Sequence, residues 1–391
     1  MKIQSILILL LLILLNSCGN QRQIYLEKKT SIGNEKIQYT ISPYVIKDAI
    51  LDSIEYNNYS VYQDSSGVSF IFLLNEATAN FEIYNLEEKS LVLKKPYLNL
   101  IGAPDEYGEI NSIYFHNFDS IFIAQHFLIS LIDTSQIIFS KIINDPESDL
   151  NPEAFYLNQG EFPIFYDSEA KGLLIQTYCS ACKFYENNYF ESPIESIIKF
   201  DSKSILKFPT QYSRKYLEGY YGFANQVHRT TYNEFSYYSF PIDPNIYEFN
   251  RKNNTLNILG GRSNFQITEP NTLERKYKDD SNRKFRHMYQ VPFYHQVIFD
   301  PYRNYFYRFF SKSLPLKNED GTYNSWGDKE LILMVFNSKF ELLEEVKLGK
   351  HKYSTTKSFV TKDGLFISNS HYKNSNYDKK SIRFNLFKFS K

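Results

Sequence analysis

The chain of 391 residues carries 44 basic and 44 acidic side chains, and 42% of its residues are hydrophobic. This composition is too apolar for a disordered chain and supplies a large core, while three cysteines are too few for a disulfide scaffold. The balanced charge offers no electrostatic footprint for nucleic acid, so we expect no nucleic-acid partner.

The first eighteen residues have the features of an export leader. Lys2 precedes an unbroken run of ten Ile and Leu residues, 6–15, which is about half the length of a membrane-spanning helix. The segment Leu15-Asn16-Ser17-Cys18 resembles the bacterial lipobox, which implies that residues 1–17 are a signal peptide and that Cys18 is acylated, as by palmitate. Residues 18–35 would form the tether. Gly19 after the cysteine and the absence of a following acidic tract resemble lipoproteins sorted to the periplasmic side of the outer membrane.

Residues 36–391 repeat one pattern, in which short apolar strands alternate with polar turns in groups of four. The groups span residues 59–93, 112–142, 162–208, 227–259, 295–348 and 356–389, with turns such as Asp64-Ser65-Ser66-Gly67 and Asp133-Thr134-Ser135-Gln136. Asp, Asn, Ser and Gly between Val, Ile, Tyr and Phe strands are typical of β-hairpins. Four strands per repeat predict the blade of a β-propeller.

We therefore expect an all-β fold, a single six-bladed β-propeller of four-stranded antiparallel blades. A β-sandwich also contains many short strands, but a chain of this length would need two or three sandwiches and a linker, and no linker composition interrupts the sequence. The sixth group ends one strand short at Lys391, and the stretch 36–41 has a strand-like pattern with no group of its own. An open sheet edge must be paired, so an N-terminal strand is predicted to complete the last blade.

The pattern resembles the six-bladed propeller lipoproteins of Bacteroidota-type bacteria, and in particular the family of domain of unknown function 4221. The lipobox at Cys18, the segment Gly102-Ala103-Pro104-Asp105-Glu106-Tyr107-Gly108, the segment 113–123 and the aromatic blade strands carry this resemblance. It implies an envelope propeller and transfers no catalytic residue.

The long connections of such a ring meet on one face, here named the long-loop face, and the tight hairpin turns meet on the opposite, short-turn face. The long connections span residues 94–111, 144–161, 178–193, 209–226, 260–294, 311–329 and 370–380. Long loops on a rigid scaffold concentrate binding residues, so we expect function on the long-loop face. Cys179 and Cys182 in one of these loops are predicted to form a local disulfide, with free thiols or weak metal binding as alternatives.

Aromatic and basic side chains gather in two further long loops. The candidate ligand contacts are Tyr220, Tyr221, Arg283, Arg286 and Trp326. Tyrosines beside Gly219 and Gly222 could stack on sugars or on extended peptide, or could form a lid packed over a blade edge. The basic loop could bind an anionic sugar, a phosphate or an acidic peptide, or could simply be solvated.

Three histidines are placed on or beside the first strands of their blades, which line the central channel in this architecture. His116, His228 and His295 could serve a metal or a general base, or could be hydrogen-bonded channel residues. We expect no cofactor, because the chain contains no recognised enzyme motif. The leading hypothesis is a lipid-anchored binding module for a peptide, glycan or envelope protein. The alternative is a metal-dependent hydrolase of lactonase type with its site in the channel.

Overall fold

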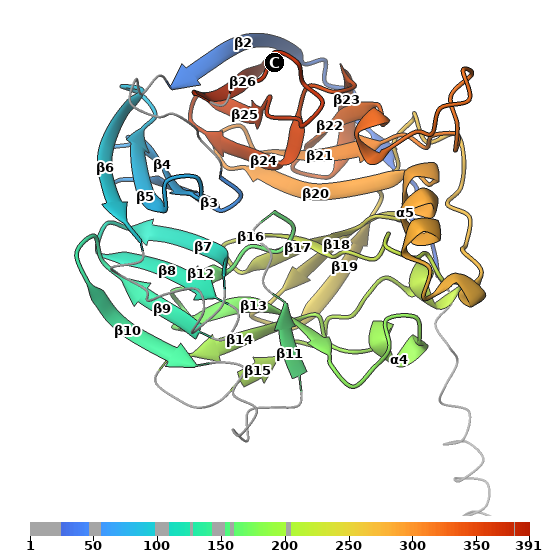
Figure 1. The fold of residues 1–391 in the computed structure, drawn as a ribbon, viewed down its shortest axis with the longest axis horizontal. Coiled ribbons are helices and arrows are strands. Elements are labelled where there is room, and N and C mark those ends of the chain that lie inside the picture. Colours follow the sequence, from blue (N-terminus) through green and yellow to red (C-terminus); the bar gives the residue numbers. More distant parts are fainter. Residues whose placement is uncertain are drawn as a thin grey trace, which may run out of the picture.

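The computed structural model describes residues 25–46, 56–97, 109–125, 128–142, 153–156, 160–200, 205–378 and 380–391. Six antiparallel sheets form a closed ring, and the chain visits them in order around it (Figure 1). The prediction of a single six-bladed β-propeller is confirmed. The predicted signal peptide, Cys18 and the segment 102–108 lie outside the described residues.

Each blade runs from an inner strand at the channel to an outer strand at the rim. Blade 1 consists of β3 (Tyr59–Gln63), β4 (Ser69–Asn75), β5 (Asn80–Asn85) and β6 (Ser90–Pro96). Blade 2 consists of β7 (Ile110–Asn117), β8 (Ser120–Gln125), β9 (Leu128–Ile132) and β10 (Ile137–Ile142). Blade 3 consists of β12 (Phe165–Asp167), β13 (Gly172–Cys179), β14 (Glu195–Lys199) and β15 (Ile205–Lys207). Blade 4 consists of β16 (His228–Tyr232), β17 (Phe235–Phe240), β18 (Asp243–Asn250) and β19 (Thr255–Leu259). Blade 5 consists of β20 (Phe293–Asp300), β21 (Tyr305–Ser311), β22 (Leu331–Asn337) and β23 (Glu341–Gly349). Blade 6 consists of β24 (Ser354–Thr361), β25 (Gly364–Ser368), β26 (Ile382–Ser390) and the N-terminal strand β2 (Gln38–Ile46).

The N-terminal strand closes the ring as predicted. β2 pairs antiparallel with β26 along nine residues, from Gln38 opposite Ser390 to Ile46 opposite Ile382. Residues 25–32, within the predicted tether, also contact the propeller. β1 (Ser31–Ile32) pairs in parallel with β23, and Glu27 forms an ion pair with Arg262 beside blade 4.

The core lies between neighbouring blades, because each sheet packs one face against the blade before it in the ring and the other face against the blade after it. The second strand β4 and the third strand β22 therefore consist almost entirely of buried residues. One apolar cluster joins blades 6 and 1, and includes Phe359 and Phe384 packed on Ile71 and Leu73. Continuous stacking of this kind makes the ring a rigid platform for its loops.

Six short elements form inside connections that the sequence marked only as long loops, and three of them are the 3-10 helices η1 (Arg214–Leu217), η2 (Arg275–Tyr277) and η3 (Trp326–Asp328). β11 (Glu153–Tyr156) adds to β13 in blade 3, α4 (Asn187–Phe190) follows β13, and α5 (Ser281–Gln290) lies between blades 4 and 5. The basic segment is therefore helical where a loop was expected. The Asp280 carboxylate accepts a hydrogen bond from the backbone N–H of Arg283 and so caps the start of α5.

Candidate functional site

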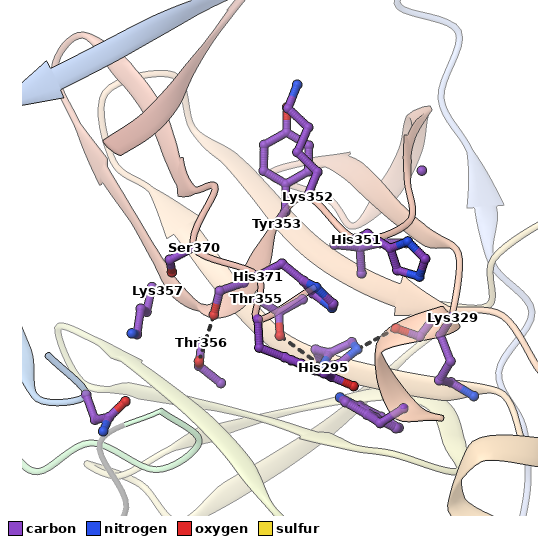
Figure 2. Close-up of a pocket in the computed structure, with 17 residues that line it drawn as sticks. His295, Lys329, His351, Lys352, Tyr353, Thr355, Thr356, Lys357, Ser370 and His371 are labelled. Atoms are coloured by element: carbon purple, nitrogen blue, oxygen red, sulfur yellow. Dashed lines mark hydrogen bonds between the residues drawn. The ribbon is translucent and has the colours of Figure 1, made fainter. Parts of the chain in front are cut away.

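A pocket of about 290 Å³ opens on the long-loop face where blades 5 and 6 meet (Figure 2). Three connections build it: residues 325–329 between β21 and β22, residues 349–353 between β23 and β24, and residues 370–372 between β25 and β26. The first and third connections are tied together, because the Tyr372 hydroxyl accepts a hydrogen bond from the Gly327 backbone N–H at 2.9 Å. A Cβ at Gly327 would lie 2.4 Å from that hydroxyl, so any larger residue would have to displace the exposed Tyr372 side chain and break this contact.

Basic and hydroxyl side chains dominate the wall of this pocket. The basic ones are His295, Lys329, His351, Lys352, Lys357 and His371, and the hydroxyl ones include Ser311, Ser354, Thr355, Thr356 and Ser370. Trp326 and Tyr372 add aromatic surface. Among the described residues that line the pocket, none is Asp or Glu. A cavity with this lining is electrostatically suited to an anion.

Lys329 is the most buried of the three lysines, with 5% of its surface exposed. Its ammonium group donates hydrogen bonds to the backbone carbonyls of Tyr289, at 2.8 Å, and of Val291, at 2.6 Å, at the end of α5. Burial lowers the pKa of Lys329 to about 7. Its charge therefore depends on pH near neutrality, and a bound anion would favour the protonated form.

The two loop histidines at the rim are held by neighbouring residues. His351 Nε2 lies 2.8 Å from an Asp328 carboxylate oxygen, and the Lys373 ammonium donates to both oxygens of the same carboxylate at 2.8 Å. His371 Nδ1 accepts a hydrogen bond from the Lys373 backbone N–H at 3.0 Å, and the two imidazole rings are 5.9 Å apart. The Asp328 carboxylate thus holds the His351 ring in place and pairs with the positive charge of Lys373.

The structure brings together two of the three predicted channel histidines. The rings of His228 and His295 are 6.0 Å apart, and both are at least nine-tenths buried. Burial lowers the pKa of His228 to about 3 and that of His295 well below its ordinary value, so both are neutral. His295 is hydrogen-bonded to Ser311 at 2.8 Å and lines the basic pocket. His116 lies apart from them, against Tyr166 on the next blade.

The channel itself forms a cavity of about 380 Å³ to which all six blades contribute, with Tyr59, Tyr114, Phe165, Thr230 and Ser358 among its lining residues. Within the described part of the chain, no three His, Cys, Asp or Glu side chains are grouped so that they could hold a metal ion.

The five predicted ligand contacts do not form one site. Trp326 lines the basic pocket, whereas Tyr220 and Tyr221 are each 3% exposed. The two tyrosines pack against neighbouring rings, Tyr220 against Phe184 and Tyr221 against Tyr216. Arg283 stacks on Tyr277 at 5.1 Å and Arg286 on Tyr323 at 4.9 Å, and both lie on α5 outside the pocket.

A second cavity, named here the aromatic cleft, lies beside blades 3 and 4 and has a volume of about 400 Å³. The structure joins Cys179 and Cys182 in a disulfide at its wall. The other lining residues are Glu161, Gln176, Tyr178, Phe184, Tyr189, Tyr212, Phe223, Asn225, Gln226 and Val227. It also belongs to the long-loop face, since these residues come mainly from the connections 178–193 and 209–226.

Sequence reasoning missed most of the basic pocket. Lys329, His351, Lys352, Lys357 and His371 were not singled out, because each is an ordinary surface residue in its local context. A signal was present nonetheless. Two long connections, 311–329 and 370–380, end on adjacent blades and bracket a third connection that contains His351 and Lys352.

Six four-stranded blades in a closed ring define this protein as a six-bladed β-propeller. The chain belongs to the family described as domain of unknown function (DUF4221), whose family model matches residues 42–347. The chain is similar to a crystal structure of a member of that family from Bacteroides vulgatus, with 17% identity, a TM-score of 0.74, and coverage of 92% of this chain and 99% of the other. At that identity the likeness shows the fold alone.

The chain is also similar to a second solved structure, a predicted exported protein from Bacteroides fragilis. The two share 10% identity and a TM-score of 0.49, and the match covers 93% of this chain and 98% of the other. No curated protein matches the chain. Of the helices that the structure describes, none is long and apolar enough to cross a membrane.

Proposed function

We propose that this propeller is a lipoprotein that is anchored to the outer membrane through Cys18 and faces the periplasm. It acts as a binding or interaction module on its long-loop face. Its partner is a peptide, a glycan or an envelope protein that presents an anionic group to the basic pocket. The observation that carries this proposal is the lining of that pocket, which combines three lysines and three histidines with hydroxyl groups and includes no described acidic residue.

The geometry supports binding of a carboxylate, sulfate or phosphate group. Lysine ammonium groups and hydroxyl groups donate charge-assisted hydrogen bonds to such anions, and these bonds are stronger in a partly desolvated pocket than in water. Three connections that join rigid strands, two of them tied together by the Gly327–Tyr372 hydrogen bond, hold the donors in place before binding, which reduces the entropic cost of association. The described residues provide no observation that favours the metal-dependent hydrolase.

Calorimetric titration with sodium sulfate tests the pocket, because sulfate is the simplest probe of this charge and keeps that charge across the working pH range. We expect measurable binding to the purified chain. The double variant Lys352→Met, Lys357→Met should lose about a hundred-fold or more in affinity, since each lysine supplies a charge-assisted contact worth about 1.5–3 kcal/mol.

The matched control is Lys252→Met on the short-turn face, where Lys252 pairs with Glu169. Its sulfate affinity should equal that of the unaltered chain. The absence of sulfate binding, or an equal loss in the control and the double variant, would show that the pocket does not bind anions.

A further inference from the structure

We propose that the aromatic cleft is a second binding site, which takes the pyranose ring of a neutral carbohydrate. This site is separate from the anion pocket, because the two cavities share no lining residue. The inference therefore does not rest on the proposed anion site.

The aromatic side chains supply the apolar wall that such a ring needs. The ring centroids of Tyr178 and Tyr189 are 6.5 Å apart, and those of Tyr189 and Tyr212 are 5.5 Å apart. Phe184 and Phe223 complete the lining. A pyranose presents C–H groups on its faces and hydroxyl groups around its edge, so aromatic surface is complementary to the faces.

The polar side chains supply partners for the hydroxyl edge. Gln176, Asn225 and Gln226 each carry an amide group that both donates and accepts hydrogen bonds. The side-chain oxygen of Gln226 is buried and accepts no hydrogen bond from the part of the chain that the structure describes. Burial raises the pKa of Glu161 to about 7, so at neutral pH its carboxyl group occurs both in a protonated form, which can donate a hydrogen bond, and in an ionised form, which only accepts.

The charge of the lining distinguishes this cleft from the basic pocket. Among its described lining residues there is no lysine or arginine, so the wall itself presents no positive charge to an anionic ligand. The nearby Lys284 ammonium lies 4.5 Å from the centre of the Phe223 ring and 5.2 Å from that of Phe184. Lys284 is 6% exposed, so it holds these rings in place from within the protein.

The cleft is also rigid before any ligand arrives. The Cys179–Cys182 disulfide closes the loop that leaves β13, and the Tyr216 hydroxyl donates a hydrogen bond to the Ala224 carbonyl at 2.9 Å, which secures the loop that carries Phe223. Preorganised walls lose little conformational freedom on binding. Mixed aromatic and amide lining with no net positive charge is best matched by a neutral sugar.

Saturation-transfer NMR tests the cleft on the full chain in a detergent without a sugar headgroup. The probes are methyl β-D-glucopyranoside, methyl β-D-galactopyranoside, methyl α-D-mannopyranoside and N-acetyl-D-glucosamine, and N-acetyl-tyrosine amide is included as a peptide-like comparison. We expect transfer to the ring C–H protons of at least one sugar. Phe223→Ala should weaken that sugar about ten-fold, and Gln226→Ala should weaken it to a similar extent.

Tyr323→Ala is the matched control, because Tyr323 is 56% exposed on the long-loop face and lines neither cavity. It should leave sugar binding unchanged, and circular dichroism should show that all three variants are folded. Transfer to no sugar, transfer unaffected by both cleft variants, or binding of the tyrosine amide alone would overturn the proposal. Loss of sulfate binding in the lysine variants with sugar binding intact would separate the two sites.

Discussion

Individual residues of the basic pocket take their properties from burial. A lysine on a surface loop keeps its charge throughout the physiological range, but Lys329 is buried under α5 and has a pKa of about 7. The charged and titratable groups around it are the other lysines and the three histidines of the pocket wall and, beside it in the chain, Asp328 and Glu330, of which Glu330 pairs with Lys312. Burial lowers the pKa values of His295 and His371, so these two lose their protons below the range in which Lys329 titrates.

Sulfate affinity should therefore fall as the pH rises from about 6 to about 8, because an anion binds the protonated form of Lys329 and that form is lost through its pKa of about 7. Titration calorimetry at both pH values measures the effect. Lys329→Arg should keep most of its affinity at the higher pH, since a guanidinium group stays protonated there. If His351→Gln removes the pH dependence while Lys329→Arg preserves it, the assignment to Lys329 is wrong.

At the level of the element, β2 decides whether the ring is closed. The last three strands of the chain leave β26 with an unpaired edge, and β2 supplies its missing neighbour from more than 330 residues away. The C-terminal end of β2 is buried between blades, with Ile46 fully buried, whereas Ile41 in the middle of the strand is 44% exposed. Ring closure thus depends on the packing of the second half of this strand.

Ile46→Ala should lower the free energy of unfolding by about 2–5 kcal/mol, because it removes buried methyl groups and leaves a cavity between blades 6 and 1. Ile41→Ala is the matched control in the same strand, and we expect it to change stability by less than about 1 kcal/mol. Urea denaturation followed by tyrosine fluorescence measures both. Equal effects of the two substitutions would mean that β2 is not packed into the blade as described.

For the whole molecule, residues 25–32 extend the contacts of the chain beyond the blades. The Tyr25 hydroxyl donates to an Asp243 carboxylate oxygen at 2.8 Å, and the Asn245 side chain accepts from the Lys28 N–H at 2.8 Å. Six residues lie between Cys18 and Tyr25, so the chain can span at most about 25 Å between them. A lipid on Cys18 would therefore hold the propeller close to the membrane rather than on a long flexible stalk.

Mass spectrometry of the membrane fraction should show a chain that begins at Cys18 and carries acyl groups. The expectation follows from the lipobox and the ten-residue apolar run before it. Cys18→Ser should move the protein out of the membrane fraction, while Cys179→Ser, with the other cysteines intact, should leave it there. An unmodified Cys18 or a retained residue 1–17 segment would contradict the proposed anchor.

Local patterns in the sequence were sufficient to predict the blades and the closure of the ring. Hairpins are formed by residues near one another, and alternating apolar residues with Asp, Asn and Gly turns identify them without tertiary knowledge, as at Asn254 and Asn304, which adopt the left-handed backbone that such turns require. The missing fourth strand of the last blade was likewise visible from counting strands. The hairpins and the missing strand both follow from the order of elements along the chain.

The ligand sites were decided by the tertiary structure alone. His295 on β20 becomes a neighbour of Lys329, His351 and His371, which lie in three different connections, only because the ring stacks blade 6 on blade 5. The sequence left open whether Tyr220 and Tyr221 stack on a ligand or pack as a lid, and the structure buries both of them. Burial and long-range proximity depend on how the loops pack over the propeller, and the periodicity of a single sequence does not contain that information.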